Sequence, residues 1–104
     1  MNDKVLTMED MLKQSSLAAT FLKALSNENR LMILCYLLDR ELSVTALNEK
    51  LPLSQSALSQ HLALLRKDGL VTTRRESQTI FYSLGDARVK TLIQTLHELF
   101  CPTL

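Results

Sequence analysis

The chain has 104 residues and a net charge of +1, and 46% of its residues are hydrophobic, with 2 glycines, 2 prolines and 2 cysteines. This length and composition predict one mainly helical domain, residues 1–104, whose small core benefits from burial against a partner. No apolar stretch reaches the roughly 18 residues of a membrane-spanning helix and no secretion signal is recognisable, so we expect a cytoplasmic protein with reduced cysteines.

Three helices are predicted in the first half of the chain. The first begins after Thr7, which forms a capping box with Asp10. Its apolar stripe packs in the core or on a partner helix and consists of Leu17, Phe21, Leu22 and Leu25. A second helix follows the N-cap Asn27, with one apolar face formed by Leu31, Leu34, Cys35 and Leu38. Ser43 opens a third, which stops before Pro52.

The segment from Leu51 to Gly69 predicts a recognition helix. Ser54 supplies its N-cap, and Gly69 suits the left-handed residue that follows a helix end. The spacing i, i+4 and i+7 predicts one buried face, formed by Leu58, Leu62 and Leu65. The opposite face, called the reading face below, carries Gln55, Ser56, Ser59 and Gln60. These uncharged groups both donate and accept hydrogen bonds, as base edges require, although an ordinary solvated face is an equally good interpretation of this helix alone.

The segment from Leu70 to Leu84 predicts a hairpin of two strands with a polar tip near Glu76 and Ser77. Alternation predicts one half-buried face, formed by Ile80, Tyr82 and Leu84. A helix pair followed by a basic ribbon is typical of a winged helix-turn-helix. We therefore expect a mainly α fold with a small two-stranded antiparallel β-wing, in the order α-α-α-α-β-β-α.

A last helix is predicted after Asp86 and ends before Pro102. Its broad apolar face consists of Val89, Leu92, Ile93, Leu96, Leu99 and Phe100. One small core cannot cover this face and the stripe of the first helix together. We therefore expect the two terminal helices to form the interface of a homodimer.

Positive charge is concentrated around the reading face and the wing. Residues 1–53 carry 6 basic and 7 acidic side chains, whereas residues 54–90 carry 6 basic and 3 acidic ones. This distribution favours a DNA-binding surface, and the modest total favours a dimer on a palindromic operator. The expected DNA-contacting residues are Ser54, Gln55, Ser56, Ser59, Gln60, Arg66, Arg74, Arg75 and Gln78.

Four segments carry a resemblance to a known family: ALSNENRLMILCYLL, SQSALSQHLALLRKDGLV, QTIFYSL and LHELFCP. From about Ala18 to Pro102, the chain resembles the ArsR/SmtB winged-helix transcriptional regulators, and within them the HlyU-like, sulfide- and redox-responsive group. The resemblance implies a dimeric regulator of haemolysin-type virulence genes or of sulfur and redox-stress genes. It also implies that Cys35 and Cys101 form a sensor pair, linked on oxidation directly or through sulfur atoms.

Two metal sites that are common in this family are not matched. The segment that carries a thiol-rich site in relatives reads Glu41–Leu47 here, with hydroxyls at both thiol positions. The segment that begins a second site has Arg88 where an imidazole is needed. We expect no cofactor and no metal, although a zinc site formed by Cys35, His97 and Cys101 stays open as an alternative.

Other roles for the thiols also stay open from the residues alone. Cys35 could be a small buried hydrophobe, and a thiolate at Cys101 is disfavoured by its place at a helix C-terminus. A thiol oxidoreductase using Cys101 with His97 is disfavoured, because the chain has no CxxC pair, glycine-rich loop or paired carboxylates. We expect no enzyme; an architectural winged-helix protein that binds DNA without sensing is the remaining alternative.

Overall fold

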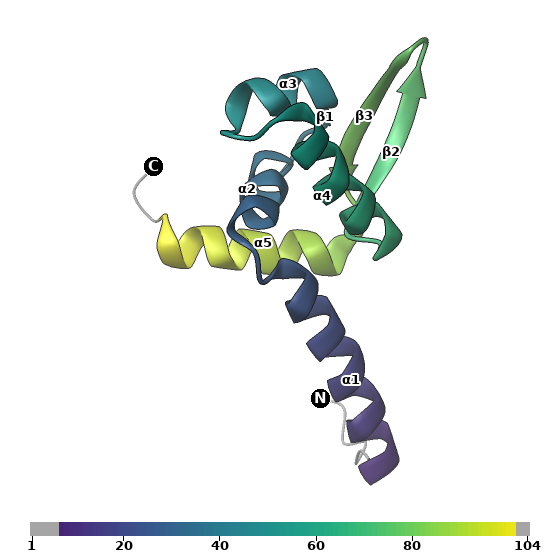
Figure 1. Cartoon of the computed structure of the whole chain (residues 1–104). Coiled ribbons are helices and arrows are strands. Elements are labelled where there is room, and N and C mark those ends of the chain that lie inside the picture. The colour runs from purple at the N-terminus through teal and green to yellow at the C-terminus, as the bar shows by residue number, and fades with distance from the viewer. Residues whose placement is uncertain (1–6, 102–104) are drawn as a thin grey trace.

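The computed structural model describes residues 7–101, which contain five helices and three strands (Figure 1). In chain order they are α1 (Met8–Leu25), α2 (Glu28–Tyr36), β1 (Leu42–Ser43), α3 (Val44–Lys50), α4 (Gln55–Lys67), β2 (Val71–Glu76), β3 (Thr79–Leu84) and α5 (Ala87–Phe100). The predicted mainly helical fold with a β-wing is confirmed. The wing is the hairpin formed by β2 and β3, and no helix within the described residues is both long and apolar enough to cross a membrane.

Each predicted helix start is confirmed, because each depends on a local side-chain cap. The Thr7 hydroxyl accepts from the backbone N–H of Asp10 at 3.0 Å, and the Asp10 carboxylate accepts from Thr7 in return. The other N-caps are Asn27, Ser43, Ser54 and Asp86. Gly69 follows α4 in the left-handed region, with φ +76°. Helix α5 ends at Phe100 with Cys101 as its C-cap, whereas the predicted stop at Pro102 lies outside the described residues.

The sheet has one strand more than the sequence predicts. Its order is β1-β3-β2, all antiparallel, and Leu42 and Ser43 of β1 pair with Tyr82 and Phe81 of β3. A two-residue strand carries no alternation, so the sequence reveals only the helix cap at Ser43. The predicted inward face of β3 holds for Tyr82 and Leu84, which pack on the core, and is wrong for the exposed Ile80, because the wing extends beyond the core (Figure 1).

The core joins α2 to the faces of α4 and α5. Its fully buried members include Ile33, Leu34, Leu37, Leu47, Leu58, Leu62, Leu65, Val89 and Ile93. The predicted buried face of α2 is therefore partly wrong, since Cys35 is exposed and Ile33 and Leu37 are buried instead. Residues 31–38 are almost all apolar, so their periodicity does not select one face.

Helix α1 projects away from the rest of the molecule (Figure 1). Every residue from Met8 to Thr20 is exposed, and only Leu25, at the end of the helix, is buried. The large exposed apolar side chains of α1 are Met8, Met11, Leu12, Leu17 and Leu22. The end of α5 adds Leu99 and Phe100, so much of the predicted terminal apolar surface is uncovered within a single chain.

Two glycines pack backbone to backbone where the wing joins the helices. The N–H of Gly85 donates to the carbonyl of Leu70 at 2.9 Å, and a Cβ at Gly85 would overlap the carbonyl oxygen of Gly69. We expect Gly85→Ala to lower the free energy of unfolding by about 1 to 3 kcal/mol, because backbone must shift to admit the methyl group. Urea denaturation measures this change.

Gly69→Ala is the comparison, because a Cβ there meets open space and only the positive φ is strained. Its expected cost is about 1 kcal/mol, the smaller of the two. Equal stability of Gly85→Ala and the wild type would mean that the close backbone contact between Gly69 and Gly85 is absent in solution.

Candidate nucleic-acid interface

Helix α4 separates its leucines from its polar residues, as predicted. Leu58, Leu62 and Leu65 are at most 1% exposed. All the polar residues expected to contact DNA on this helix and its cap are exposed: Ser54, Gln55, Ser56, Ser59, Gln60 and Arg66. The Ser54 hydroxyl accepts from the N–H of Ala57 at 3.1 Å, which fixes the first turn. The reading face is therefore presented on a helix anchored by its opposite side.

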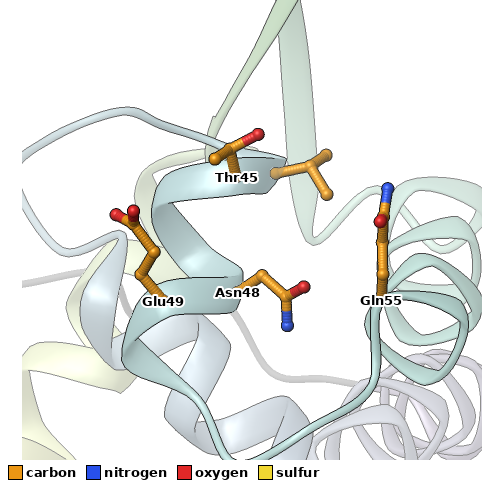
Figure 2. A pocket seen from close by; sticks show the side chains of 5 residues that line it. Thr45, Asn48, Glu49 and Gln55 are labelled. Atoms are coloured by element: carbon orange, nitrogen blue, oxygen red, sulfur yellow. The ribbon is translucent and has the colours of Figure 1, made fainter.

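A pocket of about 250 Å³ separates α3 from the first turn of α4, lined by Val44, Thr45, Asn48, Glu49 and Gln55. Figure 2 shows Asn48 pointing across this pocket toward Gln55. The Asn48 side-chain amide donates to the carbonyl of Leu53 at 2.8 Å, and this bond fixes the turn between the two helices. Asn48 was not among the predicted site residues. The sequence shows only a polar residue inside a short helix, and its half-burial is visible only in the structure.

A groove of about 470 Å³ lies between α4 and the wing. It is lined by Ser59, Ala63, Arg66, Lys67 and Tyr82. Two cations and a phenol beside the reading face match the requirements of a phosphate backbone, since phosphates accept hydrogen bonds from Arg, Lys and Tyr. Lys67 and Tyr82 were not among the expected DNA-contacting residues. Tyr82 was predicted to lie on the half-buried face of its strand.

The two wing arginines differ in their surroundings. Arg75 is exposed, and its Nε donates to the carbonyl of Ser77 at 3.3 Å, beside the exposed tip residue Gln78. Arg74 instead forms ion pairs with Glu41 and Glu76. The hydrogen bond from Arg74 lowers the pKa of Glu41, and the carboxylates of Glu41 and Glu76 raise the pKa of Arg74, so Glu41 and Arg74 stay charged at neutral pH.

The two cysteines, far apart in sequence, lie near the C-terminal ends of two different helices. Both are free and exposed, Cys35 on α2 and Cys101 at the end of α5, so the alternative of a buried Cys35 is wrong. Desolvation by the surrounding protein, and secondly the charge of Cys101, raise the pKa of Cys35. No three His, Cys, Asp or Glu side chains between residues 7 and 101 gather as metal ligands would, so the zinc site of Cys35, His97 and Cys101 is not assembled.

Comparison with known proteins identifies the family. Residues 27–73 match the bacterial regulatory protein, arsR family. The chain is 57% identical to the transcriptional activator HlyU of Vibrio cholerae over 96 residues, which cover 92% of this chain and 89% of that protein. The chain belongs to the ArsR family. The biofilm growth-associated repressor of Xylella fastidiosa is 42% identical over 92% of this chain and 84% of its own length.

Solved structures confirm the winged helix-turn-helix fold of this ArsR-family chain. Reduced HlyU from Vibrio cholerae matches with a TM-score of 0.86 and 58% identity, over 90% of this chain and 99% of that one. A homodimeric winged helix-turn-helix DNA-binding domain from Mycobacterium bovis matches with a TM-score of 0.78 and 26% identity, over 97% and 94%. The relatives are regulators rather than enzymes, so the thiol oxidoreductase alternative is not supported.

Proposed function

We propose that this chain is a homodimeric transcriptional regulator that binds a palindromic DNA operator through α4 and the wing. The observation that carries the proposal is the exposed reading face of α4, held in place by buried leucines and flanked by a cationic groove. Its HlyU-like sequence and fold support the same conclusion. In this arrangement α4 enters the major groove, which accommodates one α-helix.

Base contacts and backbone contacts are assigned to different residues. Gln55, Ser56, Ser59 and Gln60 carry amides and hydroxyls that read base edges. Ser54 lies at the helix N-terminus, where backbone N–H groups and the helix dipole favour a phosphate. We assign contacts with phosphates or the minor groove to Arg66, which lines the groove between α4 and the wing, and to the exposed Arg75 and Gln78 of the wing.

A pair of substitutions tests this division. Gln60→Ala should cost about 1 to 3 kcal/mol on the operator and little on random DNA, because it removes a base contact. Arg75→Ala should weaken binding to every sequence and reduce the slope of log affinity against log salt by about 1. Fluorescence anisotropy over a series of salt concentrations measures both.

The exposed Lys13 on α1 is remote from the reading face, so Lys13→Ala is the matched control for the loss of a charge. Equal losses from Gln60→Ala on operator and random DNA would place the reading face elsewhere.

The proposed dimer uses α1 and the end of α5. Met8, Met11, Leu12 and Leu22 recur at helical spacing along an exposed face of α1, with the small Ala18 and Ala19 between them. An apolar face of this length favours burial against a partner helix. Leu92 and Leu96 of α5 pack partly against the core of their own chain, which makes α1 the cleaner place to test the interface.

We expect Leu12→Glu to produce monomers, because burying a carboxylate in an apolar interface is unfavourable unless a cation or hydrogen-bond donor lies beside it. The operator affinity should fall with it. Sedimentation equilibrium measures the mass of the assembly. Lys13→Gln is the matched control. It lowers the net charge by one, as Leu12→Glu does, but at a position outside the apolar face of α1, so this variant should stay dimeric. A Leu12→Glu dimer as stable as the wild type would place the interface elsewhere.

We further propose that Cys35 and Cys101 sense oxidants or reactive sulfur species. Oxidation would join the two sulfurs, directly or through sulfane sulfur from a reactive sulfur species; the two thiols would lose their S–H protons to solvent and pass two electrons to the oxidant. Two observations support this pairing: α2 and α5 pack together in the core, and the charge of Cys101 contributes to the raised pKa of Cys35. The bond would tie α2, which packs against α4, to the end of α5 near the proposed dimer interface. The target genes would then be of the haemolysin-type virulence or sulfur and redox-stress classes that the resemblance implies.

Oxidation should raise the melting temperature and lower operator affinity, because a long closed loop stabilises a fold by about 2 to 4 kcal/mol when unstrained. Cys35→Ser or Cys101→Ser should remove both effects. Since the pKa of Cys35 is raised, its thiolate fraction and rate of oxidation should increase as the pH rises toward that pKa. Calorimetry and anisotropy on reduced, peroxide-treated and tetrasulfide-treated protein measure these effects. Unchanged DNA binding under all three treatments would favour an architectural protein without a sensor.

A further inference from the structure

An ion-pair network crosses the small sheet from one edge to the other. Arg74 lies on β2, and Glu41 lies just before β1, 33 residues earlier. The Arg74 Nε donates to Glu41 Oε1 at 3.1 Å, and Nη2 donates to the same carboxylate. Its Nη1 donates to Glu76 Oε2 at 2.6 Å. The two carboxylates therefore accept hydrogen bonds from all three nitrogens of the guanidinium.

The path of the Arg74 side chain follows from the strand order. Since β3 lies between β1 and β2, Arg74 must cross the middle strand to reach Glu41. It crosses over Phe81, its cross-strand partner, with the guanidinium 4.7 Å from the ring centre. Arginine stacks well on aromatic faces while its edges form hydrogen bonds. The three strands are thus joined by one side chain in addition to their backbone ladder.

The wing has few other contacts that fix its direction. Beyond its base it extends as a free hairpin (Figure 1), and all seven residues from Arg74 to Ile80 are exposed. β1 contributes only two residues to the ladder. The Glu41–Arg74 contact is therefore made close to the point where β1 stops pairing with the hairpin. A hairpin held there presents its tip, with Arg75 and Gln78, at a defined angle to α4.

Arg74 is poorly placed to bind a phosphate itself. A phosphate would have to displace Glu41 or Glu76 and would then lie beside the released carboxylate. Like charges at that distance repel. Within residues 7–101 no carboxylate forms an ion pair with Arg75, whose Nε donates to the backbone carbonyl of Ser77.

We propose that Arg74 is a positioning residue that holds the wing through Glu41, and that it does not itself bind DNA. The proposal rests on the DNA-binding function proposed above and deepens it. It assigns the phosphate contact of the wing to Arg75, and gives Glu41, an acidic residue, a positive contribution to DNA affinity.

A double-mutant cycle on the full-length protein tests this assignment. Arg74→Ala, Glu41→Gln and their combination are compared for operator affinity over a series of salt concentrations. Each single change should lower affinity about three- to fivefold, as an exposed ion pair in a network allows. The double variant should be no weaker than either single one, and the salt slope should stay unchanged.

Asp39→Asn is the matched control for Glu41→Gln. Asp39 pairs with Lys90 at 2.8 Å, so both changes remove one carboxylate from a surface ion pair and add the same net charge. Removing a negative charge should slightly raise affinity for DNA in Asp39→Asn. The opposite sign in Glu41→Gln would identify a specific role in positioning. Amide relaxation of Ser77 and Gln78 should show increased mobility in Arg74→Ala and Glu41→Gln only.

Two results would overturn the proposal. If Glu41→Gln strengthens binding and Arg74→Ala reduces the salt slope by about 1, Arg74 is a phosphate ligand that Glu41 restrains. If neither change alters affinity or mobility of the tip, the ion pair has no role in the wing. In both cases Gln60→Ala and Arg75→Ala still report on DNA binding, so the proposed function is tested independently.

Discussion

The burial of three leucines determines how α4 is rotated about its axis. Leu58, Leu62 and Leu65 pack in the same core as Ile33 and Leu34 of α2. Burying each leucine contributes about 1.5 to 3 kcal/mol, so turning α4 by a single residue, about 100°, would expose side chains whose burial the fold depends on. The core therefore sets the direction of the reading face. The polar residues on that face do not contribute to the core, so their identity can be determined by the groups that they contact.

The same core leaves the two ends of the chain outside it. Helix α1 packs against the core through Phe21 and Ala24 and buries Leu25, whereas its residues from Met8 to Thr20 are exposed. The reading face and the proposed dimer surface thus belong to different parts of the molecule. Helix α2 lies between them (Figure 1), and it carries Cys35 on an exposed side. A chemical change at this position acts where the two parts meet.

Features fixed by neighbouring residues were predictable, and features fixed by tertiary pairing were not. The caps at Thr7, Asn27 and Ser54 each need one side chain within three residues, so the sequence contains the whole interaction. The buried face of α2 was not predictable, because an almost wholly apolar run supports several faces equally. The contact of Arg74 with Glu41 could not be predicted from the sequence, for a different reason. It depends on the order of strands in the sheet, and one of those strands has only two residues.

The ion pairs of Arg74 affect which residues are available to contribute to the proposed DNA affinity. With its guanidinium held by carboxylates, the proposed phosphate contacts among the described residues fall to Arg66 and Lys67, which line the groove beside the reading face, and to Arg75 on the wing. Each phosphate contact contributes only modestly and is screened by salt, so one protomer gains little affinity from charge. In the proposed dimer, binding of one half-site raises the effective concentration of the second recognition helix at its own half-site. The proposed dimer would therefore depend more on the spacing between its two α4 helices than on any one contact, and small movements at the α2–α5 junction would be enough to alter its DNA binding.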